Sequence, residues 1–262
     1  MKFFNENELG KYQSGTTDES SGDADNAFSD TITIPYISSG QTASTLVLER
    51  KLEFEATIDS IFILDSNFAD VTIYASATSG GAYVDITSNA TLLTSQDGLN
   101  RYYSFATPFS FFDMKFEVVN TSPLSQEKEV GAILGFLEIG SIERFSAIAP
   151  VKEFIRKASV LDAGGVVTMN KGSYWTYKIK TQYVGIQSEV DVVNEVQNLS
   201  SNFFFWLNDG YDGEEKVRVE PYRFEDLIKC VVTGKSKPSF YKNLLNNIVS
   251  DDVGFKQTGA VD

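Results

Sequence analysis

The sequence predicts a mainly β fold, with a sandwich or jelly roll in the first half and a second β domain with one helix after it. From Thr31 to about Phe145, short apolar stretches recur with turn signals between them, which is typical of two-sheet β domains. Period-two alternation is clear where Val71, Ile73 and Ala75 alternate with polar or aromatic residues. The Gly80-Gly81 pair then predicts a hairpin turn.

The domain organisation follows from chain length and from one proline. At 262 residues the chain is long enough for two domains that each bury a core. Pro150, within "SAIAPVKEF", predicts the boundary between them. We therefore expect a flexible acidic N-terminal arm at residues 1–30, a β-sandwich domain at 31–148 and a β domain with one helix at 149–262. The sandwich is expected to fold alone, and contacts between copies are expected in the last domain.

The N-terminal segment is acidic and has few residues to bury. Residues 1–30 contain seven acidic residues and two lysines, and such a composition does not offset the cost of ordering the chain. One interpretation is a disordered tail. The other is a segment that orders against a neighbouring subunit, for which Phe3, Phe4 and Tyr12 supply the anchors.

The second half combines strands with one helical pattern. Ser188 and Asp191 form a capping pair at the start of "SEVDVVNEVQNLSS". Apolar residues recur there at helical spacing, namely Ile186, Val190, Val193, Val196 and Leu199. Strands are predicted around it at "GGVVTMNKGSYWTYKIKTQYV", "NFFFWLN", "EKVRVEPY" and "LIKCVVTG".

Composition excludes several classes of function. The 36 acidic residues outnumber the 22 basic ones, and the net charge of -14 repels phosphate backbones and anionic lipids. Histidine is absent, which excludes Ser-His-Asp and Cys-His catalysis and zinc ligation by histidine. The single cysteine, Cys230 in "LIKCVV", cannot form an intrachain disulfide and is predicted to be a buried apolar residue. No apolar stretch has the length of a signal peptide or a membrane span, so we expect synthesis in a cytoplasm without export by a cleaved signal.

The acidic loop "NDGYDGEE" is the one cluster that resembles a metal site. Aligning Asn208 or Asp209 with the first position of a calcium loop fails to place carboxylates and glycine at the required spacings. Gly210 and Gly213 instead indicate a turn between two strands. No catalytic, cofactor-binding or metal-binding residue is predicted, and the protein is not expected to be an enzyme or to need a cofactor. A glycosidase-type pair of carboxylates stays open, because the sequence does not show how far apart two acids lie.

The run of aromatic residues from Phe203 to Trp206 has two interpretations. Consecutive residues of a strand point to opposite faces, so the strand is either covered on both sides or has one face in contact with another subunit. Aromatic residues are enriched at the centres of protein interfaces. We take Phe203, Phe204, Phe205 and Trp206 as the candidate interface residues.

Beyond these inferences, two regions of the chain resemble bacteriophage virion proteins. The stretches "KLEFEATIDSIFILDSNFADVTIYASATSGGAYVDIT", "SFFDMKFEVVN" and "VGAILGFLEIGSIERF" resemble galactose-binding-like sandwich domains of phage particles. The stretches "GGVVTMNKGSYWTYKIKTQYV", "NFFFWLNDGY" and "VRVEPYRFEDLIKCVVTG" look like the ring-forming β domain of distal-tail and tail-hub proteins. The two resemblances together cover most of residues 31–262.

The resemblance implies a non-enzymatic structural protein of the virion tail. Copies of the chain would form a ring at the tail hub, tail tip or baseplate and contact other tail proteins, with no direct binding of nucleic acid or membrane. An alternative is a carbohydrate-binding or host-receptor-binding module, with weak glycan binding by the sandwich. Four aromatics would then form a stacking platform, although core packing explains them equally well: Tyr102, Tyr103, Phe111 and Phe112.

Overall fold

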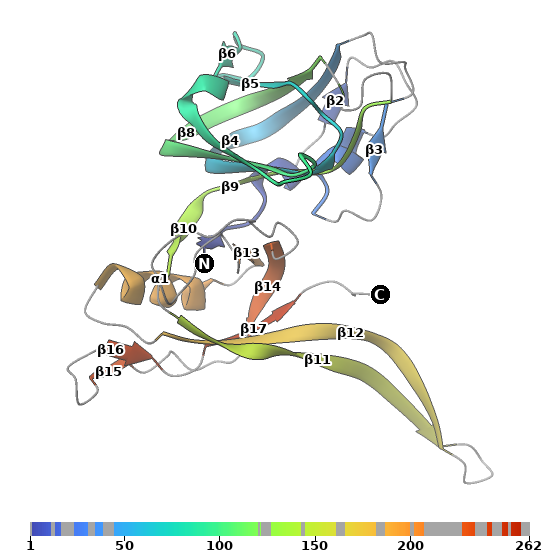
Figure 1. Ribbon diagram of the computed structural model, residues 1–262, viewed down its shortest axis with the longest axis vertical. Coiled ribbons are helices and arrows are strands. Elements are labelled where there is room, and N and C mark those ends of the chain that lie inside the picture. Colours follow the sequence, from blue (N-terminus) through green and yellow to red (C-terminus); the bar gives the residue numbers. More distant parts are fainter. Residues whose placement is uncertain are drawn as a thin grey trace. The chain divides into compact units, whose positions relative to one another are not determined.

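The computed structural model shows a mainly antiparallel β protein that divides into two compact units (Figure 1). It describes residues 2–11, 14–16, 24–30, 35–38, 45–119, 121, 127–142, 145–160, 166–181, 187–199, 202–206, 227–233, 240–242, 248–250 and 253–257. Of the described residues, 5–138 form the sandwich unit, and residues 2–4 together with those from Ile139 onward form the second unit. The prediction of a mainly β fold with one α-helix is confirmed for the described residues.

The sandwich unit is built on two long strands that each contribute to both layers. The first half of β4 (Leu46–Ser66) pairs with the second half of β8 (Arg101–Val118), and the second half of β4 pairs with the first half of β8. One layer is completed by β2 (Ser14–Thr16), β5 (Val71–Ser76) and β6 (Val84–Asp85). The other is completed by β3 (Tyr36–Ile37), β7 (Ala90–Thr94) and β9 (Glu129–Phe136).

Two complementary bulges let β4 and β8 pass between the layers. Between the pairs Lys51–Asp113 and Ala56–Phe111, four residues of β4 lie opposite one residue of β8. Between the pairs Ile58–Phe109 and Ser60–Ser104, four residues of β8 lie opposite one of β4. Unpaired extra residues bend a strand and increase its twist. Pro108, which has no N–H to donate to a ladder, lies in the second bulge.

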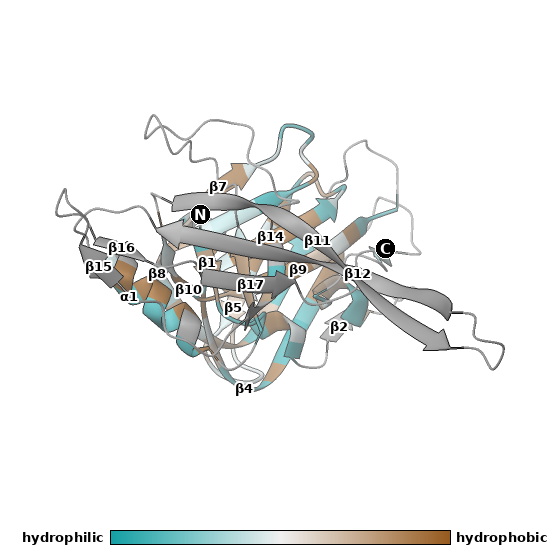
Figure 2. Ribbon diagram, turned by 90° about the horizontal axis from the view of Figure 1, so that it is seen from below, coloured by the Kyte–Doolittle hydropathy of each residue, from teal (hydrophilic) through white to brown (hydrophobic). Residues whose placement is uncertain are grey.

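Alternation along the strands forms the sandwich core. Met114, Phe116 and Val118 are fully buried, while Lys115 and Glu117 between them are only partly buried. Figure 2 shows the same alternation of hydrophobic and hydrophilic residues along β4. Burying each large apolar side chain stabilises the fold by about 1.5–3 kcal/mol, which makes this alternation the main determinant of which face points inward.

The second unit contains a seven-stranded sheet and one α-helix. In sheet order the strands are β10 (Glu138–Ser141), β1 (Lys2–Phe4), β13 (Phe203–Trp206), β14 (Leu227–Thr233), β17 (Val253–Gln257), β12 (Val166–Thr181) and β11 (Phe145–Val160). A separate pair is formed by β15 (Phe240–Lys242) and β16 (Ile248–Ser250). The helix α1 (Gln187–Asn198) lies where the valine pattern predicts it and buries Val193 and Val196. It packs closely on β10, because a Cβ at Gly140 would lie only 2.3 Å from Cγ2 of Val192.

In the described parts of residues 1–30, the structure shows strands and 3-10 helices where the sequence predicts a flexible arm. Lys2–Phe4 form strand β1, whose neighbours in the sheet are β10 and β13. Leu9, in the 3-10 helix η1 (Glu8–Lys11), and Phe28, in η2 (Ala24–Phe28), are fully buried in the sandwich core. The prediction of a flexible arm failed because it relied on the acidic composition of the segment. A few apolar residues in it are buried against partners that are distant in sequence.

The boundary predicted at Pro150 also moves. The two units divide between Glu138 and Ile139. Pro150 instead lies inside β11, where the pairing with β12 is interrupted between Ile148 and Val151. A residue without an N–H is tolerated at such an irregularity, so the proline marks a break in a ladder rather than a domain boundary.

The aromatic run that we assigned to an intersubunit contact lies in the interior of the second unit. The exposed fractions of Phe203, Phe204, Phe205 and Trp206 are 0%, 3%, 0% and 0%. Their strand β13 pairs with β1 on one side and β14 on the other. The Phe3 ring lies 6.3 Å from the Phe203 ring and 6.4 Å from the Phe205 ring. Because side chains buried within one chain are not available to a partner, the interpretation as a strand covered on both sides is the one that fits.

The acidic loop from Asn208 to Glu215 lies outside the described residues. Within the described parts of the chain, no helix is long and apolar enough to cross a membrane.

Candidate functional site

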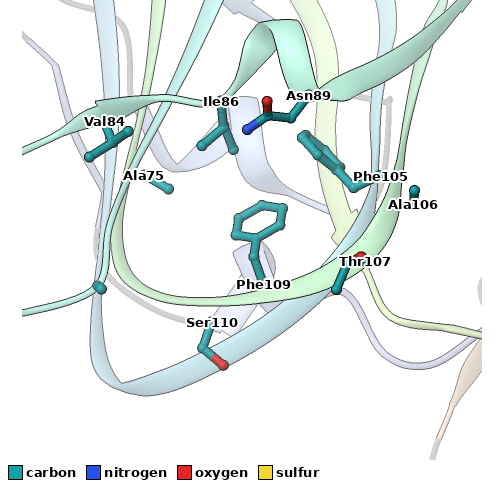
Figure 3. Close-up of a pocket in the computed structure, with 10 residues that line it drawn as sticks. Ala75, Val84, Ile86, Asn89, Phe105, Ala106, Thr107, Phe109 and Ser110 are labelled. Carbon is teal, nitrogen blue, oxygen red and sulfur yellow. The ribbon is translucent and has the colours of Figure 1, made fainter.

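A cavity of about 440 Å³ opens in the sandwich unit beside the bulge of β8 (Figure 3). Strands β5, β6 and β8 and the 3-10 helix η3 (Thr87–Asn89) contribute its walls. Its lining residues are Ala75, Ala77, Val84, Ile86, Asn89, Phe105, Ala106, Thr107, Phe109 and Ser110. This volume lies within the range of small-molecule sites in proteins, about 300–1,000 Å³.

The bulge of β8 produces one wall of the cavity. The four residues of β8 that lie opposite Asp59 include Phe105, Ala106 and Thr107, and all three line the cavity. Ala106 and Thr107 are exposed, which is expected of residues that a bulge lifts out of the ladder. The same feature that bends the sandwich therefore creates the concave surface.

Two phenylalanines form the aromatic part of this wall. The ring of Phe109 meets the ring of Phe105 edge to face, with centroids 4.8 Å apart and an interplanar angle of 66°. Phe105 is buried whereas Phe109 is only partly buried. Figure 3 shows the Phe109 ring pointing into the space between Ile86 and Phe105. Phe109 is thus a supported aromatic surface that a ligand can reach.

Hydrogen bonds fix the opposite wall. The Ile73 N–H donates to the Thr87 hydroxyl at 2.7 Å, and the Ile86 N–H donates to the Ile73 carbonyl at 2.9 Å. The Thr87 N–H donates to the Asp85 carboxylate at 2.8 Å. These contacts hold η3 against β5 and so set the positions of Ile86 and Asn89.

The cavity has apolar walls and three polar side chains near solvent. Asn89, Thr107 and Ser110 are exposed, and the Ser110 hydroxyl lies 2.8 Å from the Thr57 hydroxyl. None of the lining residues is ionisable. The arrangement can bind and orient a neutral molecule with polar and apolar faces, and its lining offers no acid, base or nucleophile of catalytic type.

The stacking platform proposed from the sequence is mostly core. Tyr102 is 2% exposed and stacks on Phe62 at 4.6 Å, and Tyr103 and Phe111 are 3% and 0% exposed. Burial also raises the pKa of Tyr103. Only Phe112 is partly buried. The four residues lie on the strand that forms the cavity wall, but Phe105 and Phe109 were not among them. The proline within "SFATPFSFF" was the sequence signal for the bulge.

A second polar cluster lies on the same unit. The Lys115 ammonium lies 4.1 Å from the Tyr74 ring centre and 5.3 Å from that of Tyr83. Asp113, which is 1% exposed, accepts a 2.6 Å hydrogen bond from the Gly80 N–H. Gly80 has a φ of 66°, so the glycine pair forms the tight turn expected from the sequence. The pKa of Tyr83 is raised to about 12, chiefly by burial and further by the negative charges of Glu49 and Asp113.

Metal and thiol chemistry find little support in the described residues. Among them, no group of three or more histidine, cysteine or acidic side chains is placed to hold a metal ion. Cys230 is buried, and this burial raises the pKa of its thiol well above the ordinary value. The thiol therefore stays protonated and unreactive at neutral pH.

Comparison with known proteins gives structural neighbours only. No protein-family model and no curated protein matches the sequence. Chitosan-binding module 1 from a chitosanase/glucanase of Paenibacillus sp. IK-5 is 13% identical, with a TM-score of 0.41 over 49% of this chain and 97% of the module. The family 32 carbohydrate-binding module of Clostridium perfringens NanJ, solved with galactose, is 13% identical, with a TM-score of 0.39 over 51% of this chain and 98% of that one. Two such domains of C. perfringens ZmpB, solved with GalNAc, are 18% identical, with a TM-score of 0.38 over 48% of this chain and 32% of that one.

Proposed function

We propose that this chain is a non-catalytic carbohydrate-binding protein that holds a neutral sugar in the cavity beside the β8 bulge. The observation that carries the proposal is the combination of the partly buried Phe109 ring with the polar side chains of Asn89, Thr107 and Ser110 around one cavity. Ligand sites typically combine apolar and aromatic walls with a few placed polar groups.

The chemistry of a sugar ring matches these walls. One face of a pyranose exposes C–H groups, which pack on an aromatic ring, while its hydroxyls need amide or hydroxyl partners. Phe109 supplies the ring, and Asn89 supplies both a donor and an acceptor. Because the lining lacks ionisable side chains, a neutral sugar fits better than a carboxylated one, whose charge would be left unpaired.

Calorimetric titration of the full chain tests the proposal. Galactose and GalNAc, which two of the structures named above contain, are suitable first probes because both are neutral sugars. Replacing Phe109 by Ala should weaken binding about tenfold, and Asn89→Ala about fivefold through one lost hydrogen bond.

Phe54→Ala is the matched control, because Phe54 is 63% exposed in the sandwich unit but does not line the cavity. Its affinity should equal that of the unchanged protein. A Phe54 variant that loses affinity while Asn89→Ala and Phe109→Ala retain it would place the sugar elsewhere. Absence of binding to any neutral sugar would overturn the proposal.

A second function, structural assembly of a virion tail, is favoured by the length of the β11–β12 hairpin. Each strand has 16 residues, but within the described part of the chain only Thr176–Ile179 of β12 pair with a third strand, β17. A two-stranded ribbon is marginally stable in water, so the rest of the hairpin is suited to contact with another chain. The proposed partners are further copies in a ring and other tail proteins. A purified protein whose mass in solution corresponds to a ring of six, or a multiple of six, supports this role, and a monomer at all concentrations opposes it.

A further inference from the structure

Charge is distributed very unevenly between the two units. Residues 5–138 contain 20 acidic and 6 basic residues, and this difference equals the net charge of the whole chain, -14. All other residues together contain 16 acidic and 16 basic residues. Residues 5–138 are therefore strongly anionic, whereas the rest of the chain is neutral in sum.

Within the second unit, the hairpin strands are cationic. Together β11 and β12 contain one acidic residue, Glu153, and six basic residues. The basic residues are Lys152, Arg156, Lys157, Lys171, Lys178 and Lys180. The hairpin thus has the charge opposite to that of the sandwich unit of the same protein.

The backbone of the hairpin is also incompletely paired. Among the described strands, β11 is the last in its sheet and pairs only with β12. The paired segments Arg156–Val160 and Val166–Asn170 have no third strand beside them within the described part of the chain. Figure 1 shows this part of the ribbon extending past the other strands of its unit. Open strand edges present N–H and C=O groups that pair readily with another polypeptide.

We propose that the β11–β12 hairpin of one copy docks on the acidic sandwich unit of a second copy. This inference rests on the assembly role proposed above and names its contact. A polypeptide strand can pair with both the N–H and the C=O groups of the open edge, and an acidic polypeptide complements the net positive charge of the hairpin sequence. The chain itself supplies a partner with both properties. The contact joins two different surfaces, so repeating it produces a ring when the rotation closes.

Sedimentation velocity of the full chain at several concentrations and salt levels is the first test. We expect association that weakens about tenfold between about 50 mM and about 500 mM NaCl, because salt screens the attraction between the basic and acidic surfaces. This series uses the natural sequence, so it does not depend on the folding of any variant.

Charge reversal in the hairpin is the second test. Lys157→Glu should weaken association about tenfold. Lys51→Glu is the matched control, since its side chain is 63% exposed in the sandwich unit and the reversal gives the same net charge. Because this reversal makes the proposed acidic partner surface more negative, it should not weaken association. Lys171→Gln gives a milder change at a different position should Lys157→Glu not fold.

The outcomes separate the docking contact from assembly itself. Oligomers whose affinity responds neither to salt nor to the hairpin variants would overturn the docking contact and leave the assembly role standing. A monomer under all conditions would overturn both. Binding of a short DNA duplex that Lys157→Glu abolishes, without self-association, would assign the hairpin to a polyanion and overturn the proposal. None of these results bears on sugar binding at the β8 cavity.

Discussion

Asn5 and Leu137 exchange two hydrogen bonds where the chain enters and leaves the sandwich unit. The Asn5 N–H donates to the Leu137 carbonyl at 3.1 Å, and the Leu137 N–H donates to the Asn5 side-chain oxygen at 2.9 Å. The two ends of the unit are therefore held together. Such an arrangement is typical of a domain inserted into another fold, since its termini lie close to each other.

A fragment of residues 5–138 should fold alone. The matched comparison is residues 31–148, the domain that the sequence predicts, which lacks the buried Leu9 and Phe28. Each lost core side chain contributes about 1.5–3 kcal/mol, so we expect the shorter N-terminus to lower the free energy of unfolding by about 3–6 kcal/mol. Urea titrations followed by circular dichroism measure both fragments. Equal stability of the two would show that the N-terminal segment is not part of this core.

Asn7→Ala should destabilise the sandwich unit by about 2–4 kcal/mol, because a buried amide with several partners is lost. Asn7 is 4% exposed, and its side-chain oxygen accepts hydrogen bonds from the N–H groups of Leu9 and Gly135. Its amide nitrogen donates to the Asp30 carboxylate at 2.9 Å. The change leaves the Gly135 N–H buried without its acceptor. Chemical denaturation provides the measurement, with the exposed Asn89→Ala as the control that should stay near the natural stability.

The sequence predicted the strands better than it predicted what surrounds them. Alternation in residues 71–76 and the valine spacing of the helix identified elements correctly, because local periodicity records which face is buried. The N-terminal segment was misassigned because Asn7 and Phe28 are fixed by partners far along the chain. The cavity was not predicted because it also depends on pairing between distant residues. Only the register of β8 against β4 shows that Phe105 lies in a bulge.

The ion pair between the buried Arg50 and the exposed Asp25 should respond differently to changes at its two ends. Arg50 is 3% exposed, lies 2.7 Å from the carboxylate of the 59% exposed Asp25 and packs 5.1 Å from the Phe28 ring centre. Burial lowers the pKa of Arg50, and the hydrogen bond and negative charge of Asp25 offset part of this decrease. Asp25→Asn removes the negative charge beside a buried cation and should cost about 1 kcal/mol, a value reduced by the exposure of Asp25.

Arg50→Met is the informative counterpart. It keeps an apolar stem against Phe28 and removes both the buried charge and the Nε atom that has no hydrogen-bond partner. We expect its stability to lie within about 1 kcal/mol of the natural protein, since apolar replacements of buried ion pairs are often neutral. Arg50→Ala, which also loses the packing, should be clearly less stable in the same urea titration. A larger loss in Arg50→Met than in Arg50→Ala would contradict this account.

Tyr83 should make the stability of the sandwich unit fall at alkaline pH. Burial, then Glu49 and Asp113, raise its pKa in the folded protein from 10.0 to about 12. Between these two pH values the unfolded chain releases the phenol proton while the folded chain retains it. Because the unfolded state then binds fewer protons than the folded state, the free energy of unfolding decreases as pH rises through this window. The contribution is complete below pH 10 and is lost by about pH 12.

Tyr83→Phe should remove this part of the pH dependence while leaving the stability at neutral pH nearly unchanged. The phenolate absorbance of the natural protein, minus that of Tyr83→Phe, should rise near pH 12 rather than near pH 10, and a difference curve centred at the lower value would refute the assignment.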